Sequence, residues 1–364
     1  MKERREIRGS VEHTSGSRKR PRALSVNERN SLLHRAWELT RDRDYPGVRT
    51  LLSPISRSHL LDNPELGYLL ANAGFSTGEW EHSLDLVLDL TEPIDRLGHP
   101  WLSRHRLHLE GIIRMNRGEI AEARAIFLEV LEMASGAGDD GLAGATSTDL
   151  GITADIQCRW EEALSNYQRA SAMYQRVGSQ RGVGSVHHNL AMTYRQMGFY
   201  AEADTHFEHA MLYFRQSGSD AEIAGCDMER ALLLSTMGDS DRAGVIARRA
   251  RDCFVEIGHI AGDADSLRVL GIIAARQGKR SEARGLLEDA LTRIRTVTDR
   301  LTEAEILEEL AVLEHLEGNA TASADRAGEA RRLYLQLGAT PRAERLGGRL
   351  VRQEHVEGEV EGSR

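Results

Sequence analysis

Aromatic residues are scarce in this chain of 364 residues, at 5% of the sequence. A large globular core draws much of its buried area from aromatic side chains. The apolar share of 40% nevertheless provides material for a core built from leucine, alanine and glycine. The composition therefore favours an array of small units that pack against each other over one large globular core.

Cysteine is also rare. Cys158, Cys226 and Cys253 form no CxxC pair and are odd in number, so they predict buried thiols in a reducing compartment and exclude a disulfide framework. No apolar run reaches the roughly 18 residues that a membrane span needs. The first residues are polar and lead into polar sequence, unlike a signal peptide. These absences predict a cytoplasmic protein without a membrane partner.

An overall excess of positive charge is missing too. The net charge of −9 argues against nucleic-acid binding as the main activity, because such binding needs a basic surface. The charge is unevenly distributed: residues 1–24 hold eight basic and three acidic residues, which leaves about −14 for the remainder. The basic run at residues 17–22 could contact nucleic acid, an acidic partner or an anionic lipid surface, although a solvated leader is the more frequent meaning of such a run.

Proline is absent from residues 101–340, although the chain contains seven prolines elsewhere. The interior of a helix does not tolerate proline, because the ring removes a backbone hydrogen bond and clashes with the preceding turn. A stretch of this length without proline therefore predicts a run of helices.

The sequence repeats itself every 40 residues. Cys158 occupies one point of this grid, and glycine occupies the others: Gly78, Gly118, Gly198, Gly238, Gly278 and Gly318. Small residues precede each point by seven positions: Ala71, Gly111, Gly151, Ala191, Ala231, Gly271 and Ala311. Small residues also follow each point by five positions: Ser83, Ala123, Ala163, Ala203, Ala243, Ala283 and Ser323. Self-similarity at a fixed period indicates a repeat architecture.

Each period predicts two antiparallel helices, one before the grid glycine and one after it. Glycine adopts the positive φ that ends a helix and lets the chain turn back, and small residues let two helix axes approach to roughly 8–10 Å. Larger residues are expected to fill the space between repeats: Phe127, Tyr167, Phe207 and Leu287. Another set is expected to cap each second helix against the next repeat: Tyr174, Phe214, Phe254, Ile294 and Tyr334. A second glycine series marks the loops between repeats, with Thr298 in its gap: Gly98, Gly138, Gly178, Gly218, Gly258 and Gly338.

One period carries a pattern of a known family: Asn189, Leu190, Ala191, Tyr194, Gly198, Tyr200, Ala203, Phe207 and Ala210. This pattern resembles the tetratricopeptide repeat, and the resemblance covers roughly residues 65–350. The period of 40 residues is longer than the usual one of about 34. It is similar to the extended repeats of spindle-orientation adaptors, kinesin light chains and the helical regions of large bacterial transcription activators.

The resemblance implies an all-α fold, a right-handed superhelical solenoid of antiparallel helix pairs. Seven repeats are expected over residues 63–340. We expect residues 29–62 to form a degenerate helical unit before them, and residues 341–364 a capping helix followed by a frayed tail. Residues 1–28 lack apolar periodicity and are expected to be a disordered basic leader.

In the tetratricopeptide repeat family the first helices line a concave groove that holds an extended or helical peptide, so the resemblance implies such a groove here. Carrying the positions over gives the candidate groove residues Tyr68, Asn72, His108, Ile112, Ile152, His188, Met192, Arg195, Leu232, Arg268, Ile272 and Arg276. Packing between neighbouring first helices would explain the apolar positions equally well. The arginines could take carboxylates of a partner, while a solvated face is the simpler interpretation of each one alone.

Two histidine pairs with i, i+3 spacing are the remaining candidates for a site: His105 with His108, and His206 with His209. Each pair shares one helical face, where two imidazoles could hold a metal. No third ligand is spaced to join either pair, so ordinary surface or interface histidines are expected and no metal. The GxGxxG match at residues 136–141 follows a helix instead of a strand, so it predicts a loop and no nucleotide site.

No serine, cysteine or carboxylate pair has a sequence context that would activate it, so no catalytic site and no cofactor are expected. The sequence therefore predicts a non-catalytic interaction scaffold that binds a partner peptide segment in its groove. The alternative is a regulator that closes around a small peptide or signal and then changes its contacts with a transcription or signalling partner. An enzyme is the third and least supported possibility.

Overall fold

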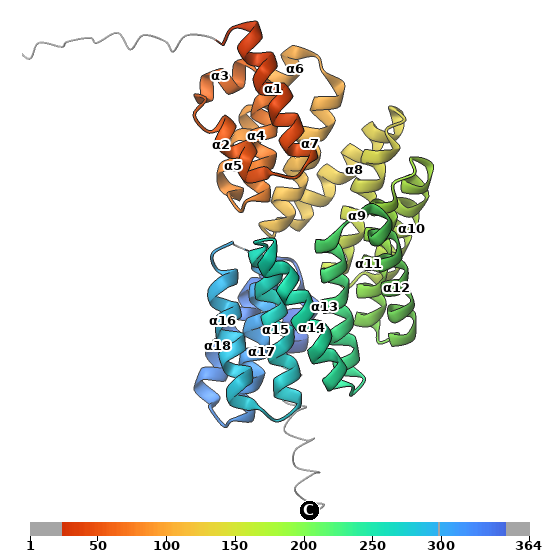
Figure 1. Ribbon diagram of the computed structural model, residues 1–364, viewed down its shortest axis with the longest axis vertical. Coiled ribbons are helices and arrows are strands. Elements are labelled where there is room, and N and C mark those ends of the chain that lie inside the picture. Colours follow the sequence, from red (N-terminus) through yellow and green to blue (C-terminus); the bar gives the residue numbers. More distant parts are fainter. Residues whose placement is uncertain (1–23, 298, 347–364) are drawn as a thin grey trace, which may run out of the picture.

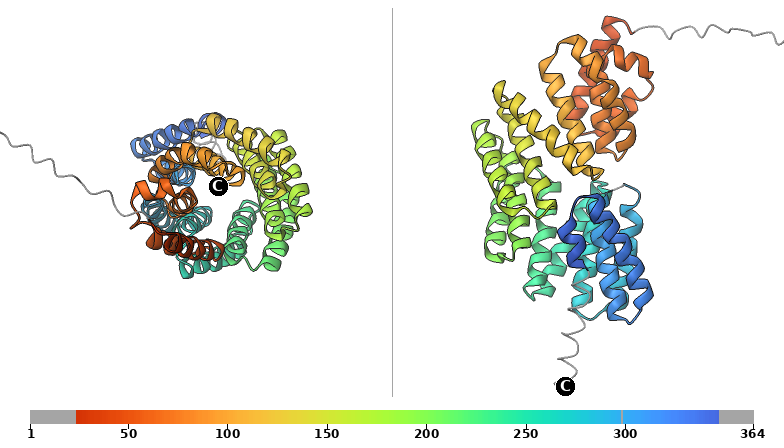
Figure 2. Two further views of the ribbon diagram at one scale, coloured as in Figure 1. Left: turned by 90° about the horizontal axis from the view of Figure 1, so that it is seen from above. Right: turned by 180° about the vertical axis from the view of Figure 1, so that it is seen from behind.

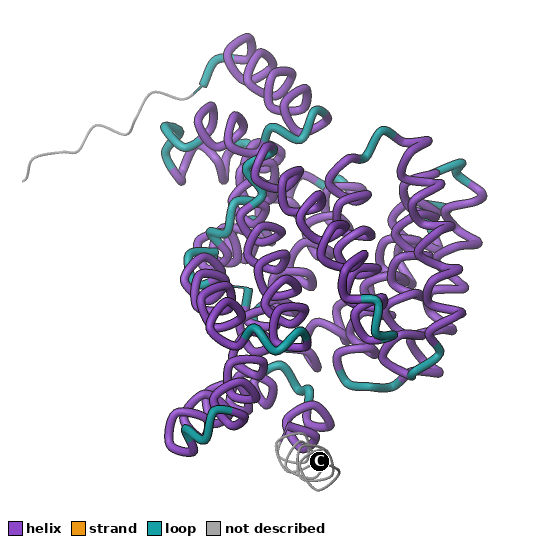
Figure 3. The backbone as a smooth tube through the Cα atoms, turned by 60° about the horizontal axis from the view of Figure 1, so that its bottom comes forward, coloured by secondary structure: helices purple, strands orange, loops and turns teal. Residues whose placement is uncertain are grey.

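The computed structural model describes residues 24–297 and 299–346, and these residues form helices and connecting turns without any strand (Figures 1 and 3). The helices are α1 (Val26–Arg41), α2 (Tyr45–Leu52), α3 (Arg57–Asp62), α4 (Pro64–Ser76), α5 (Trp80–Asp89), α6 (Thr91–Leu97), α7 (Pro100–Asn116), α8 (Ile120–Gly136), α9 (Asp140–Ile156), α10 (Trp160–Arg176), α11 (Gln180–Met197), α12 (Tyr200–Ser217), α13 (Asp220–Thr236), α14 (Ser240–Glu256), α15 (Ile260–Arg276), α16 (Arg280–Ile294), α17 (Arg300–Leu316) and α18 (Ala320–Gln336). Residues 340–346 are helical as well. No helix in the described ranges combines the length and the apolar character that crossing a membrane requires.

The helices from α4 onward alternate as first and second members of antiparallel pairs: α4/α5, α7/α8, α9/α10, α11/α12, α13/α14, α15/α16 and α17/α18. Successive pairs stack side by side and form a right-handed superhelix (Figure 1). The predicted all-α solenoid of helix pairs is thus confirmed. The division of the chain at residues 62 and 340 stays a prediction.

The N-terminal helices α1, α2 and α3 pack against α4. Helix α1 begins at Val26, so the predicted disordered leader of residues 1–28 is too long at its C-terminal end. The cause is a capping box, in which the Ser25 hydroxyl accepts from the Glu28 N–H and the Glu28 carboxylate accepts from the Ser25 N–H. The rest of the predicted leader, residues 1–23, and the predicted tail, residues 347–364, lie outside the described residues.

The grid positions have the backbone conformation that the 40-residue period predicts. All six grid glycines have positive φ, between 76° and 93°, and every glycine of the second series has positive φ as well. Cys158 adopts φ 57° at the one grid point without glycine, although a side chain makes this conformation costly. The left-handed turn is therefore a property of the repeat and not of the glycine alone.

The small residues of the grid lie where the two helices of a pair cross, and all of them are buried. A Cβ on Gly151 would lie 2.3 Å from the Tyr167 ring, and one on Gly111 would lie 2.6 Å from the Phe127 ring. The large residues Phe127 and Tyr167 therefore pack against the first helix of their own pair. They need the room that a side chain on the first helix would occupy. Tyr167 also shares an apolar cluster with Val186 and Leu190 of α11, so it fills space between repeats as well, as expected.

Two of the aromatic residues near the end of second helices, Tyr174 and Phe254, contact the next repeat, as predicted. A Cβ on Gly182 would lie 2.4 Å from the Tyr174 ring, and one on Gly262 would lie 2.4 Å from the Phe254 ring. Both glycines belong to the first helix that follows the aromatic residue. These contacts set how closely neighbouring repeats approach.

The superhelix completes about one turn and returns onto itself, so that the view along its axis is a ring (Figure 2). One apolar core joins residues of α7 to α9, such as Ile120 and Ile156, to residues after α17, such as Leu337 and Ala343. A Cβ on Gly118 would lie 2.7 Å from the Gln336 carbonyl oxygen, so only glycine permits this approach of the α7–α8 turn to the end of α18. Arg342 also donates to Gln196 at 2.8 Å across 146 residues of sequence. The concave face is therefore closed by contacts between the two ends of the turn.

Candidate functional site

A chamber of about 740 Å³ lies on the concave side of the ring. First helices of five successive pairs, α9 to α17, provide most of its wall, and residues 342 and 345 complete it. The lining residues are Ile152, Asp155, Ile156, Tyr167, His188, Asn189, Met192, Arg195, Gln196, Leu232, Thr236, Arg268, Ile272, Arg276, Leu301, Glu305, Glu308, Glu309, Tyr334, Arg342 and Arg345. Repeats in register bring the same face of every first helix to this side, which is why residues about 40 positions apart meet here.

Eight of the twelve candidate groove residues line this chamber: Ile152, His188, Met192, Arg195, Leu232, Arg268, Ile272 and Arg276. The chamber does not include Tyr68, Asn72, His108 or Ile112. Those four belong to α4 and α7, which lie beyond the closed part of the ring (Figure 1). Their proposed binding role, like that of the eight, stays a prediction.

Local partners explain the positions of the four excluded residues. The Tyr68 ring stands edge-on to the Trp101 ring, with the ring centroids 6.1 Å apart. The Trp101 centroid lies 5.7 Å from that of Trp37 on α1, so the N-terminal unit covers this end of the concave face. His108 bonds Asp149 at 2.8 Å. Ile112 packs against the main apolar core, and Asn72 is half-buried on α4.

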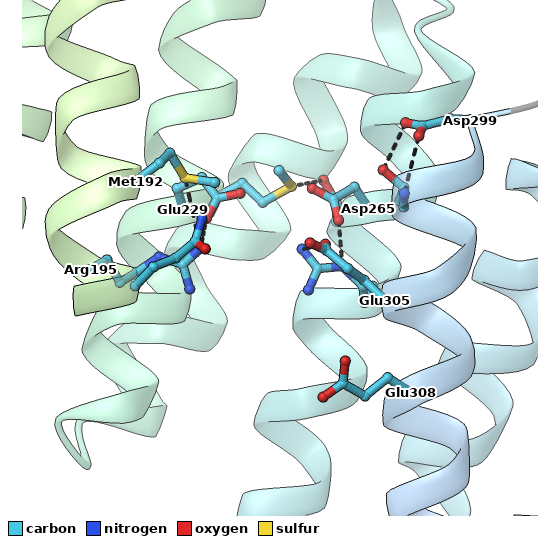
Figure 4. A network of polar contacts seen from close by, with 12 residues as sticks. Met192, Arg195, Glu229, Asp265, Asp299, Glu305 and Glu308 are labelled. Carbon is cyan, nitrogen blue, oxygen red and sulfur yellow. Dashed lines mark hydrogen bonds and ion pairs between the residues drawn. The ribbon is translucent and has the colours of Figure 1, made fainter. Parts of the chain in front are cut away.

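Charged side chains cross the chamber in a connected network (Figure 4). Arg268 of α15 donates to Asp265 at 2.5 Å and lies 3.5 Å from Glu305 of α17. Arg342 donates to the same Glu305 at 2.9 Å. Burial raises the pKa of the Glu305 carboxyl, but Arg268, Arg342 and Arg195 together hold it below its usual value. Glu305 is therefore a carboxylate that ties two arginines from different elements together.

Arg195 and Met192 of α11 face this network from the opposite wall (Figure 4). Arg195 donates to Glu229 at 2.9 Å, and Glu229 is only 5% exposed. Met192 lies beside it, with its sulfur 3.7 Å from the Arg195 guanidinium. A flexible thioether next to an arginine gives this wall both an apolar and a charged surface.

Asp155 is a buried carboxylate on the α9 wall. Its Oδ2 accepts from the Tyr167 hydroxyl at 2.8 Å and from the Thr193 hydroxyl at 2.7 Å. Burial raises the pKa of Asp155 to about 6, against the opposing effect of these two hydrogen bonds and of Arg342. The charge on this side chain therefore changes within a physiological range of pH.

Three buried polar atoms of the chamber wall lack a hydrogen-bond partner within the described residues: Asp155 Oδ1, Arg195 Nε and Arg342 Nε. A buried polar group without a partner costs about 1–3 kcal/mol, and more when it is charged. All three atoms are buried within the wall, and other atoms of these side chains form the surface of the chamber.

Family models of the tetratricopeptide repeat match the chain in three stretches, residues 106–176 with one model and residues 187–216 and 264–300 with another. These stretches coincide with helix pairs of the solenoid. In these matched stretches the chain consists of tetratricopeptide repeats.

Solved structures of similar fold include other repeat proteins of this size. A Rap protein complexed with Competence and Sporulation Factor is 13% identical with a TM-score of 0.58, over 92% of this chain and 99% of that one. NprR in complex with its cognate peptide NprX is 12% identical with a TM-score of 0.59, over 92% and 100%. Aspartyl phosphate phosphatase F from Bacillus subtilis is 13% identical with a TM-score of 0.51, over 91% and 95%. At these identities the similarity concerns the fold, and a comparison with curated protein sequences gives no match.

The tetratricopeptide repeat pattern located the apolar part of the chamber but missed much of its polar part. Glu305 lies two turns before the apolar column residue Val312 on α17, where the family pattern assigns no role, whereas Glu308 lies 40 residues after Arg268 and continues the column of His188 and Arg268. Tyr334 was assigned to packing, yet its hydroxyl donates to Glu308 at 2.8 Å at the chamber wall. Arg342 and Arg345 follow the last clear repeat, and only closure of the ring brings them to α11 and Cys158. No periodic signal in the sequence marks these two residues.

Proposed function

We propose that this tetratricopeptide repeat protein is a non-catalytic binding protein whose chamber holds a short peptide segment of a partner. Ligand pockets in proteins typically measure about 300–1,000 Å³ and combine apolar walls with a few polar groups. The chamber has this size, with Met192, Leu232 and Ile272 as apolar wall and charged groups on both sides.

The observation that carries the proposal is the lining of the chamber, where Asp155, Arg195 and Arg342 stand beside the apolar wall. A peptide offers hydrogen-bond donors, acceptors and apolar side chains, so one bound segment can match this mixed lining. The arginines suit a carboxylate or carbonyl oxygen, and Asp155 suits an N–H or ammonium group. These groups come from α9, α11 and the C-terminal segment, so a ligand would bridge three parts of the ring.

Two similar structures support a peptide as the ligand. The Rap protein was solved with Competence and Sporulation Factor, and NprR was solved with its cognate peptide. Both are matched over nearly their whole length by this chain. The shared fold supports a peptide ligand, and the chamber residues named above determine which peptide fits.

The state of the His188–Cys226 pair supports a non-catalytic role. His188 Nδ1 lies 3.2 Å from Cys226 Sγ, a geometry that could resemble a nucleophile with its base. However, burial lowers the pKa of His188 to about 4, and burial with nearby carboxylates raises the pKa of the Cys226 thiol far above its usual value. A reactive cysteine needs a lowered pKa, so this pair is a buried contact between α11 and α13.

Fluorescence anisotropy with a library of labelled short peptides tests the proposal, and Met192→Glu is the decisive variant. A carboxylate added at the apolar wall should weaken binding of the selected peptide at least about 10-fold, since it removes apolar contact with the ligand and competes with the ligand for Arg195. Met237→Glu is the matched control, because Met237 is 60% exposed. Circular dichroism establishes that both variants keep their helices. Equal affinities of the two variants, or a library without any binder, would contradict a binding chamber.

A second candidate function is that of a regulator that senses a peptide. It is favoured by Arg342, which lines the chamber and also bonds both Glu305 and Gln196 at the closure of the ring. A ligand that contacts Arg342 would stabilise the closed ring, and so could change a surface that another protein contacts. Small-angle scattering distinguishes the two: compaction on adding the peptide supports the regulator, and an unchanged radius of gyration supports a rigid scaffold. We propose the cytoplasm as the place of either function.

A further inference from the structure

Three histidines of one repeat meet outside the chamber lining. His187 belongs to α11, and His206 and His209 lie one turn apart on the partner helix α12. One ring nitrogen from each lies within 4.8 Å of the others, and the Nδ1 atoms of His187 and His206 are 2.9 Å apart. The expectation that no third ligand joins the pair of His206 with His209 is wrong, because the antiparallel pairing of α11 and α12 brings in His187, 19 residues away from His206.

The spacing of these nitrogens matches the demands of a zinc ion. Zinc binds histidine nitrogen at about 2.0–2.1 Å with tetrahedral angles, which places two ligand nitrogens about 3.3 Å apart. The separation of 2.9 Å between the Nδ1 atoms of His187 and His206 is close to this value, and the third nitrogen lies within 4.8 Å of the others. His209 is exposed while His187 and His206 are half-buried, so an ion can enter from solvent on the His209 side.

Neighbouring rings hold two of the histidines in place. The Tyr213 ring stacks on His187 at 5.6 Å with an interplanar angle of 8°, and the Tyr194 ring stacks on His206 at 5.2 Å and 9°. Tyr213 belongs to α12 and Tyr194 to α11, so each histidine is held by a ring from the opposite helix of the pair.

We propose that His187, His206 and His209 form a site for one Zn²⁺ ion, with the fourth coordination position left to water or an external ligand. Three histidines with an open position form one of the established zinc ligand sets. Bound there, the ion would join the two helices of the α11/α12 pair. This site is independent of the peptide proposed for the chamber.

Isothermal titration of the metal-free full chain with Zn²⁺ tests the site. One Zn²⁺ per chain should bind with a saturable isotherm, and the thermal midpoint of unfolding should rise because the ion binds the folded state. His209→Ala should weaken binding more than about 100-fold, beyond the roughly 10–100-fold typical of losing an outer-shell partner. His209 is exposed, so this change leaves the core intact.

His105→Ala is the matched control. His105 and His108 have the same i, i+3 spacing, but His105 stacks on Trp101 and His108 bonds Asp149, so their rings do not converge. This variant should bind Zn²⁺ as the unaltered chain does. Equal losses in the two variants, or binding without a defined stoichiometry, would overturn the proposal. Substituting Co²⁺ adds a second measurement, since a tetrahedral site gives intense visible absorption that His209→Ala should abolish.

Discussion

At the scale of single residues, the buried carboxylate of Asp155 connects the chamber to the stability of the protein. Asp155 is 8% exposed, and only one of its oxygens has partners within the described structure. Burial raises its pKa from 3.8 to about 6. The folded protein therefore holds a proton on Asp155 more tightly than the unfolded chain does.

The sign of the resulting pH dependence follows from this shift. Below about pH 4 the group is protonated in both states and has no effect. Between pH 4 and 6 the unfolded chain loses the proton first, so the free energy of unfolding falls as the pH rises. Asp155→Asn removes this pH-dependent loss. The free energy of unfolding of the variant, relative to that of the unaltered protein, should therefore rise by about 2–3 kcal/mol from pH 4 to pH 7. Urea denaturation at both pH values measures it.

The control for this prediction is Asp325→Asn, since Asp325 is an exposed carboxylate on α18. It should follow the pH dependence of the unaltered protein. A parallel pH dependence of Asp155→Asn and the unaltered protein would contradict the assignment of a buried, ionising carboxyl to the chamber wall.

At the scale of elements, the helix pair is the unit that the small residues specify. Ala203 of α12 is fully buried and lies in one apolar cluster with Ala191 of α11 and with Phe207. A larger side chain at this crossing would force the two axes apart. Ala203→Leu should therefore reduce the free energy of unfolding by about 1–3 kcal/mol.

Ala201→Leu gives the same chemical change two residues earlier on the same helix, where the side chain is exposed. Its effect should be close to zero, because leucine is nearly as good a helix former as alanine. Thermal and urea denaturation of the two variants measure the difference. An equal cost in both would mean that the crossing is not tightly packed.

At the scale of the whole molecule, the ring depends on contacts between its two ends. Arg342 donates to Gln196 at 2.8 Å and to Glu305 at 2.9 Å, and Arg345 donates to the Cys158 sulfur at 3.2 Å. The end of α18 also rests against the turn at Gly118. These contacts close the chamber on one side, so the enclosure of the site is a property of the complete turn.

Arg342→Ala should open the ring. Losing one partner of a largely buried, hydrogen-bonded charge pair costs about 2–5 kcal/mol, and here the loss acts between the two ends of the turn. The radius of gyration from small-angle scattering should rise, and amide hydrogen exchange should increase in residues 339–346. Arg331→Ala, at an exposed position of α18, is the control and should change neither. Unchanged scattering from Arg342→Ala would show that apolar contacts alone close the ring.

The sequence by itself determined the helix pairs, their order and the face that the first helices turn inward. The reason is local. A positive φ at each grid point turns the chain back, and a small residue at each crossing, such as Gly151 or Ala203, lets the two helices pack closely as an antiparallel pair. Repeats in register then place residues 40 positions apart on one wall. The spacing of Met192, Leu232 and Ile272 in the sequence therefore predicts that they line the same surface.

Only the tertiary structure decided which of these residues share an enclosed site. The rotation between neighbouring repeats is a small angle that accumulates along the array, so its sum decides whether the ends of a turn meet. That sum brings Arg342 to Gln196 and leaves Tyr68 outside the chamber. The pairing of α11 with α12 likewise supplies His187 to the histidines of the next helix. Contacts of this kind depend on the path of the backbone in space, and residue spacing along the sequence does not predict that path.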